Sequence, residues 1–190
     1  SEGGAQNIWR MDADGSNPKP LTTDYKVGKI RPTLSVGGDL ITFLGRAVDP
    51  ATKELVPGSV FWQMDTEGQN LRQVVNDTNC AFVAASADRD WVVYTTRGDG
   101  IFRIWKAPLK GGEAVRLTDV DSTTPAISND GRSVAYFIEE DGKPLRIGII
   151  SIDGGAPLKT FVLPTTANTD AGIAWNKMGN GILFVNTLGT

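Results

Sequence analysis

The chain has 190 residues, with 19 Lys and Arg against 22 Asp and Glu, one Cys and no His. The lack of His excludes Ser-His-Asp and Cys-His catalysis and His-ligated zinc within this chain, and Cys80 alone forms neither an internal disulfide nor a Cys-rich metal site. A net charge of −3 with interspersed signs gives no electrostatic reason to bind nucleic acid or an anionic membrane.

Four stretches along the chain share one pattern of alternating apolar residues, a glycine-containing turn and a short second strand. They begin at Ile8-Trp9, Phe61-Trp62, Ile104-Trp105 and Ile149-Ile150, and their turns contain Gly15, Gly68, Gly112 and Gly155. The second strands end in Leu21-Thr22, Val74-Val75, Leu117-Thr118 and Phe161-Val162. The turn glycines lie 53, 44 and 43 residues apart, which indicates an internal repeat.

A second motif alternates with the first and places a polar residue and a turn before an apolar strand. The polar residues are Ser35, Ser86, Ser128 and Asn176, and the strands that follow begin near Leu40, Trp91, Val134 and Ile182. The strand from Val134 to Ile138 is continuously apolar, which is typical of a strand covered on both faces of its sheet.

Each repeat therefore contains four short strands joined by Gly, Asn and Asp turns, and no stretch has a convincing helical period. Antiparallel four-stranded sheets of this length, stacked around an axis, are the blades of a β-propeller. We predict an all-β propeller of about four blades. The expected blades are residues 28–77, 79–121 and 123–165, with half blades at residues 1–24 and 169–190. An insertion rich in Pro and Gly, Arg46 to Gly58, accounts for the long first interval.

The repeat resembles that of TolB-type propellers, most clearly from Leu117-Thr118 through Ser128-Asn129-Asp130-Gly131. It also looks like the propeller sensor domains attached to bacterial Ser/Thr kinases and transcriptional regulators, and like the gating propellers of prolyl-oligopeptidase-like enzymes. The resemblance implies the fold and an extracytoplasmic or periplasmic location. It implies little about activity, because the matching residues are turn and packing positions.

The two half blades allow two arrangements. Joining them in one sheet would close a small ring through the two ends of the chain and remove the exposed sheet edges. Alternatively the chain is a slice of a larger propeller, whose open apolar faces would drive self-association, including a homodimer. Because the chain begins at Ser1 without an apolar leader, we expect a processed product or a cut-out piece.

The segment Asp12 to Asn17 is rich in carboxylates, but its spacing lacks the ligands of a calcium loop, so we predict a hairpin turn. Trp9, Trp62 and Trp105 occupy one position of successive repeats, which favours packing between blades over an aromatic sugar platform. Trp91 and Trp175 are expected in the core. We therefore expect no metal and no cofactor.

No residues form a recognisable nucleophile motif, and no glycine-rich phosphate loop precedes a helix. The carboxylates stand mostly in turns, although composition alone leaves a paired-carboxylate glycosidase open. We expect a chain without catalytic activity.

The remaining candidates are polar residues at the entrances of the inner strands, where a propeller's channel mouth lies. They are Lys29, Arg31, Asn79, Thr123, Thr124, Asn168 and Asp170. The insertion Arg46 to Gly58 and the loops Arg97-Gly98-Asp99 and Glu139-Glu140-Asp141 are expected to overhang the same face.

Three hypotheses follow, because loops on a rigid scaffold commonly carry recognition. The first is a binding or sensor module for a protein or small-molecule ligand, with no nucleic acid and no membrane contact. The second is the propeller of a hydrolase whose catalytic domain lies elsewhere, and the third is a structural scaffold. For any one of these residues, a solvated loop end without a ligand remains the plain alternative.

Overall fold

The computed structural model describes residues 7–23, 27–34, 38–47, 51–52, 59–75, 77, 79–86, 90–163 and 172–185. These residues form sixteen β-strands, and none of them forms a helix long and apolar enough to cross a membrane. Every strand pairing whose register the structure describes is antiparallel, and three of the sheets have four strands. The all-β class predicted from the repeat is confirmed.

The chain divides into two compact units, residues 1–80 and 81–190, and each is described by itself. The first unit begins with a hairpin of β1 (Trp9–Arg10) and β2 (Lys19–Pro20). Its four-stranded sheet contains, in order, β3 (Val27–Leu34), β4 (Leu40–Ala47), β5 (Val60–Asp65) and β6 (Arg72–Val75).

An apolar core joins the hairpin of the first unit to its sheet. Ile8, which precedes β1, is buried in one cluster with Ile41, Phe43 and Met64 of the sheet. Leu21 and Trp62 pack against the same cluster. Burying a side chain of this size contributes about 1.5–3 kcal/mol, so the hairpin is held mainly by these contacts.

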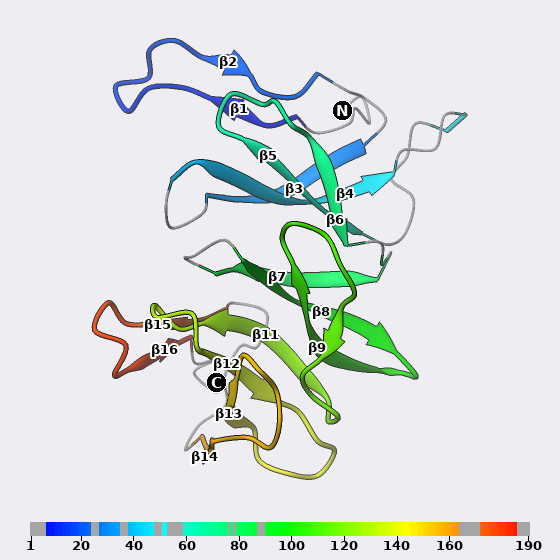
Figure 1. Cartoon of the computed structure of the whole chain (residues 1–190), viewed down its shortest axis with the longest axis vertical. Coiled ribbons are helices and arrows are strands. Elements are labelled where there is room, and N and C mark those ends of the chain that lie inside the picture. The colour runs from blue at the N-terminus through cyan, green and yellow to red at the C-terminus, as the bar shows by residue number, and fades with distance from the viewer. Residues whose placement is uncertain are drawn as a thin grey trace, which may run out of the picture. The chain divides into compact units, whose positions relative to one another are not determined.

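The second unit contains two four-stranded sheets and a final hairpin (Figure 1). The first sheet contains β7 (Cys80–Ala85), β8 (Trp91–Gly98), β9 (Ile101–Pro108) and β10 (Val115–Arg116). The second contains β11 (Ser122–Ile127), β12 (Ser133–Ile138), β13 (Arg146–Ser151) and β14 (Lys159–Val162). The hairpin pairs β15 (Ile173–Trp175) with β16 (Ile182–Phe184).

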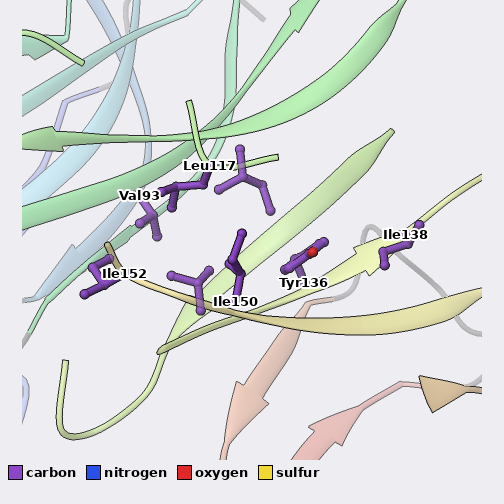
Figure 2. Packing of buried hydrophobic residues seen from close by; sticks show 8 residues of the cluster. Val93, Leu117, Tyr136, Ile138, Ile150 and Ile152 are labelled. Carbon is purple, nitrogen blue, oxygen red and sulfur yellow. The ribbon is translucent and has the colours of Figure 1, made fainter. Parts of the chain in front are cut away.

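Strand β12 is buried on both faces, as its continuous apolar sequence predicts. Val134, Tyr136 and Ile138 lie in a cluster with Val93 of β8 and Ile150 of β13, part of which Figure 2 shows. The alternate residues of β12, Ala135 and Phe137, lie in a second cluster that also contains Ile173 of β15. The side chains of one strand thus connect three successive sheets, as in stacked propeller blades.

A threonine clasp fixes the end of the outer strand in both units. In the first unit the Ile8 amide donates to the Thr22 hydroxyl at 3.0 Å, and in the second the Ile104 amide donates to the Thr118 hydroxyl at 2.9 Å. The carbonyls of Ile8 and Ile104 accept the backbone amides of Leu21 and Leu117, the residues just before the two threonines, at 2.9 Å and 2.8 Å. The repeated Leu-Thr sequence therefore has one structural role in two places.

The segment Asp12 to Asn17 forms a turn whose carboxylates are used within the turn. The Asp12 carboxylate accepts the Asn17 side-chain amide at 2.7 Å, and Asp14 accepts the backbone amide of Ser16 at 2.9 Å. In the next repeat the Asp65 carboxylate accepts the Asn70 side-chain amide at 2.9 Å. These contacts agree with the predicted hairpin turn.

The serine of the second motif closes the turn between the first two strands of a blade. The Ser128 hydroxyl donates to Asp130 at 2.5 Å and accepts the Ser133 amide at 2.9 Å. Ser86 accepts the Trp91 amide at 3.0 Å in the preceding sheet. Asn176 replaces the hydroxyl with an amide oxygen, which accepts the Gly181 amide at 3.2 Å.

The structure corrects two expectations. Packing between blades is wrong for Trp9 within a single chain, where it is 62% exposed, because only the opposite side of its hairpin contacts the sheet of the first unit. The predicted start of the insertion at Arg46 is also wrong, because strand β4 continues through Arg46 to Ala47. Within that insertion, residues 48–50 and 53–58 lie outside the described part of the chain.

The other tryptophans are partly or wholly consistent with the prediction. Trp62 and Trp105 are half-buried. Trp175 is half-buried, packs against the cluster of Ala135 and Phe137 and donates its indole N–H to the Ala126 carbonyl at 3.0 Å, so it lies at the edge of the core. Trp91 is half-buried beneath the Lys106 ammonium, which lies 4.3 Å from the ring centroid.

We expect Gly148→Ala to lower the free energy of unfolding by about 1–3 kcal/mol, the usual cost of overpacking. Gly148 lies opposite Tyr136 in the β12–β13 pairing, and a Cβ there would stand 2.5 Å from the tyrosine ring. Equilibrium denaturant unfolding measures the change. Gly98→Ala is the matched control, because a Cβ at that strand glycine meets only the end of the Arg103 side chain at 4.0 Å. Equal stability of the two variants would contradict the close packing.

We expect Ser128→Ala to raise the pKa of Asp130 toward its usual range. The Ser128 hydroxyl is the main reason why this pKa is lowered, followed by the Arg132 amide. Because the folded-state pKa is lowered, the interaction stabilises the protein above the unfolded-state pKa and is lost as pH falls through the folded-state value. The variant should therefore lose less stability on acidification. NMR titration of the side-chain carboxyls measures the shift, and Asp14, whose pKa Ser16 lowers, should stay unchanged as the internal control.

Candidate functional site

A pocket of about 620 Å³ lies in the second unit, where the loop between β12 and β13 meets the start of β9. Its lining residues are Ile101, Val120, Asp121, Glu139, Glu140, Asp141, Gly142, Lys143 and Leu145. Four of them carry carboxylates, against one ammonium. We call this concave surface the acidic pocket.

Asp121 connects the two sheets beneath the acidic pocket. Its carboxylate accepts the Phe102 amide of β9 at 3.0 Å, and its backbone carbonyl accepts the Glu139 amide at 3.0 Å. The first contact ties the residue to the β7–β10 sheet and the second ties it to the end of β12. Two backbone amides, those of Phe102 and Glu139, therefore hold Asp121 in the pocket wall.

Thr123, one of the residues singled out in the sequence, supports the Glu139 side chain. The buried Thr123 hydroxyl donates to the Glu139 carboxylate at 2.8 Å. The register of β11 against β12 shifts between Thr123 and Ala126, and Thr124 within this bulge has φ of 53°. A β-branched residue in this left-handed region costs on the order of 1–3 kcal/mol, and bulges commonly redirect side chains next to sites.

The charges of the acidic pocket are only partly balanced. Glu140 pairs with Lys143 at 3.3 Å and also forms an ion pair with Arg146. Asp121 and Glu139 are held by neutral donors, the Phe102 amide and the Thr123 hydroxyl, which fix carboxylate oxygens without cancelling their charge. Asp141 is exposed at the rim. The pocket therefore offers fixed negative charge to a cation.

The acidic pocket does not have the arrangement of a metal centre. Among the described residues, no group of three or more Asp, Glu, Cys or His side chains lies close enough together to hold a metal ion. The carboxylates that line it can form charge-assisted hydrogen bonds with an ammonium or guanidinium group.

The other predicted candidates fall in several places. Lys29 and Arg31 lie on β3, where the pairing with β4 shifts register between Ile30 and Thr33, and only their backbone is described. Asn79 is exposed in the first unit and forms a parallel bridge with Ser59. Asn168 and Asp170 lie outside the described residues. The structure brings Thr123 together with the predicted loop Glu139 to Asp141.

Sequence reasoning missed Asp121 and Lys143. The available signal for Asp121 was its place immediately before β11, the entrance that the propeller geometry already marked. Lys143 gave no signal, because a lysine in a polar turn is ordinary in any surface loop.

Cys80 is unsuited to act as a nucleophile. Its side chain is buried, and burial, with a smaller contribution from the charge of Asp77, raises the pKa of the thiol to about 12. The reactive thiolate is therefore scarce at neutral pH.

No family model matches the chain. A curated relative, the uncharacterized peptidase YuxL of Bacillus subtilis (strain 168), is 28% identical over 114 residues, which cover 59% of this chain and 16% of that protein. The chain thus spans about a sixth of the length of the relative.

Two solved structures match almost the whole chain. TolB from Acinetobacter baumannii has a TM-score of 0.73 at 18% identity, covering 96% of this chain and 43% of that one. An oligogalacturonate lyase solved with manganese has a TM-score of 0.76 at 10% identity, covering 96% of this chain and 54% of that one. The chain therefore has the fold of TolB-type β-propellers, as its repeat predicted, and spans about half the length of the matched chains.

We expect Thr123→Val to lower the free energy of unfolding by about 1–3 kcal/mol, because the Glu139 carboxylate loses a buried donor. Thr123→Ser keeps the hydroxyl and serves as the control, with a smaller loss. Thermal or denaturant unfolding measures both variants. If the valine variant, which keeps the methyl group and lacks the hydroxyl, is no less stable than the serine variant, the hydrogen bond to Glu139 does not make the expected contribution.

Proposed function

We propose that the chain is a non-catalytic propeller module that binds a positively charged ligand in the acidic pocket. The ligand is a lysine or arginine side chain of a protein partner or a small molecule with an amine. The observation that carries the proposal is the pocket itself, where loops from two successive sheets hold four carboxylates around a concave surface.

The contacts beneath the pocket support a binding role. Asp121 and Glu139 are held by the backbone and by a buried hydroxyl, so a ligand meets side chains that are already positioned. Ile101, Val120 and Leu145 provide an apolar lining that suits the methylene groups of a lysine or arginine. An extracytoplasmic or periplasmic location, and a place in a sensor protein, are part of the same proposal and rest on the family resemblance.

A charge-matched peptide comparison tests the proposal. We expect a fluorescent hexa-arginine peptide to bind the chain, a hexa-glutamate peptide not to bind, and the affinity to fall with added salt. The double variant Glu139→Gln/Asp141→Asn should weaken binding about tenfold, since two exposed ion pairs together contribute on the order of 1–2 kcal/mol. Fluorescence anisotropy measures the change.

The control is Glu113→Gln/Asp153→Asn, which removes the same charge at exposed positions away from the pocket. Equal weakening by the two double variants would mean that the peptide responds only to net charge and that the pocket assignment is wrong. Absence of any binding would favour the structural scaffold.

A second candidate function is the propeller domain of a hydrolase, and the match to the peptidase YuxL favours it specifically. The gene sequence around this chain discriminates the two. A downstream Gly-x-Ser-x-Gly motif with a later His would support the hydrolase, whereas an upstream kinase or DNA-binding domain and a membrane span would support the sensor.

A further inference from the structure

The second unit carries an apolar groove beside its last hairpin. The groove has a volume of about 620 Å³ and lies between the outer strands of the β11–β14 sheet and the β15–β16 hairpin. Ile147, Ile149, Leu158, Phe161 and Phe184 are among its lining residues. We call it the open groove. Leu158 and Phe161 are 61% and 46% exposed, which is high for apolar side chains of this size.

The repeat identifies what is missing from the open groove. Phe161 stands opposite Ile147 in its sheet, and Leu117 bonds to Ile104 at the equivalent position of the preceding sheet. Leu117 is only 6% exposed, because it lies in a cluster with Ile150 from the third strand of the next sheet. Phe161 is exposed because, among the described residues, the β15–β16 sheet has no third strand.

The first hairpin of the chain has the features of that third and fourth strand. Its threonine clasp, Ile8 to Thr22, repeats the clasp of Ile104 to Thr118 in the outer half of the β7–β10 sheet. In the described residues β1 is paired only with β2, so the hairpin lacks two inner strands. Trp9 and Met11 are 62% and 66% exposed.

We propose that the β1–β2 hairpin of a second copy of this chain adds to the free edge of β16 and fills the open groove. Each copy carries one hairpin and one groove, so two copies can form this contact twice. The joined strands form a complete four-stranded sheet, in which Trp9 and Met11 cover Phe161 and its neighbours. The exposed backbone groups of β16 gain partners in the same step.

The complete sheets of the chain fix the register of this pairing. In the β7–β10 sheet Tyr94 stands opposite Trp105 and Val93 opposite Lys106. The carbonyls of Trp91 and Gly181 accept the amides of the equivalent anchors Ser86 and Asn176, so Phe184 corresponds to Tyr94 and Leu183 to Val93. Transferred to the joined sheet, Phe184 therefore stands opposite Trp9, and Leu183 opposite Arg10.

The repeat supports the hairpin of a second copy as the occupant, because the β1–β2 hairpin is an outer strand pair of the kind that the β15–β16 sheet lacks among the described residues. Joined to β15 and β16, the two strands of the hairpin complete a sheet of four strands, the number found in each of the other three large sheets of the described residues.

Sedimentation equilibrium of the unmodified chain is the first test, with an expected mass of twice 20.3 kDa. Trp9→Lys and Phe161→Asp should each weaken the dimer at least about 30-fold, the effect of a buried hot-spot residue. Val115→Lys, at an exposed apolar position of β10, is the control and should leave the dimer intact. Both target side chains are solvent-exposed, so circular dichroism should show all three variants folded.

Mixing the two variants tests whether the hairpin of one copy fills the groove of another. The Trp9→Lys protein keeps an intact groove and the Phe161→Asp protein keeps an intact hairpin, so an equimolar mixture should form heterodimers although neither protein dimerises alone. The heterodimer has one contact without substitutions. In its other contact the lysine introduced at position 9 faces the aspartate introduced at position 161, and these opposite charges attract each other. A mixture that stays monomeric overturns the proposal.

Cross-linking tests the register. Arg10→Cys/Leu183→Cys should form disulfides between copies on mild oxidation, whereas Met11→Cys/Leu183→Cys, shifted by one residue to the opposite face, should not. If the unmodified chain is a monomer, a second copy does not fill the groove. If the disulfide forms within one copy, the hairpin of the same chain fills it. Either result overturns the proposal.

Discussion

The packing of one sheet against the next through both faces of a central strand is the constraint on which the second unit depends. Val134, Tyr136 and Ile138 face one neighbouring sheet, and Ala135 and Phe137 face the other. A single shift in register would exchange the two sets and place the small Ala135 where Tyr136 fits beside Gly148. In the second unit the turns, the clasp of Thr118 and the loops at the acidic pocket all stand on strands whose register this packing sets.

The fold was predictable because its determinants are local and repeat. A polar anchor, a turn and an apolar strand recur at a nearly constant spacing, and the structure assigns the same hydrogen bonds to Ser86 and Ser128 in successive sheets. The exposure of Trp9 was not predictable, because burial of that position depends on strands of a neighbouring sheet and not on its own repeat. The position of a residue in the repeat identifies its equivalents in other repeats, but the burial of its side chain depends on which neighbouring strands are present.

The candidate site was predictable only in part. Propeller geometry placed Thr123 and the loop Glu139 to Asp141 at one end of the blades, and their 2.8 Å hydrogen bond agrees with that placement. Asp121 was missed because its role comes from a backbone contact with β9, a strand of the preceding sheet. Such a contact leaves no trace in residue spacing. The ion pairs of Glu140 likewise depend on how one turn folds back on itself.

The threonine clasp has a consequence for how such chains change in evolution. Because the clasp and the apolar contacts of each sheet involve only itself and its immediate neighbours, a whole repeat can be gained or lost without altering the packing elsewhere. The clasps at Thr22 and Thr118 both mark the ends of outer strands, where one repeat gives way to the next. Gene duplication or deletion with boundaries at these threonines would change the number of blades and preserve the hydrogen bonds within each remaining sheet.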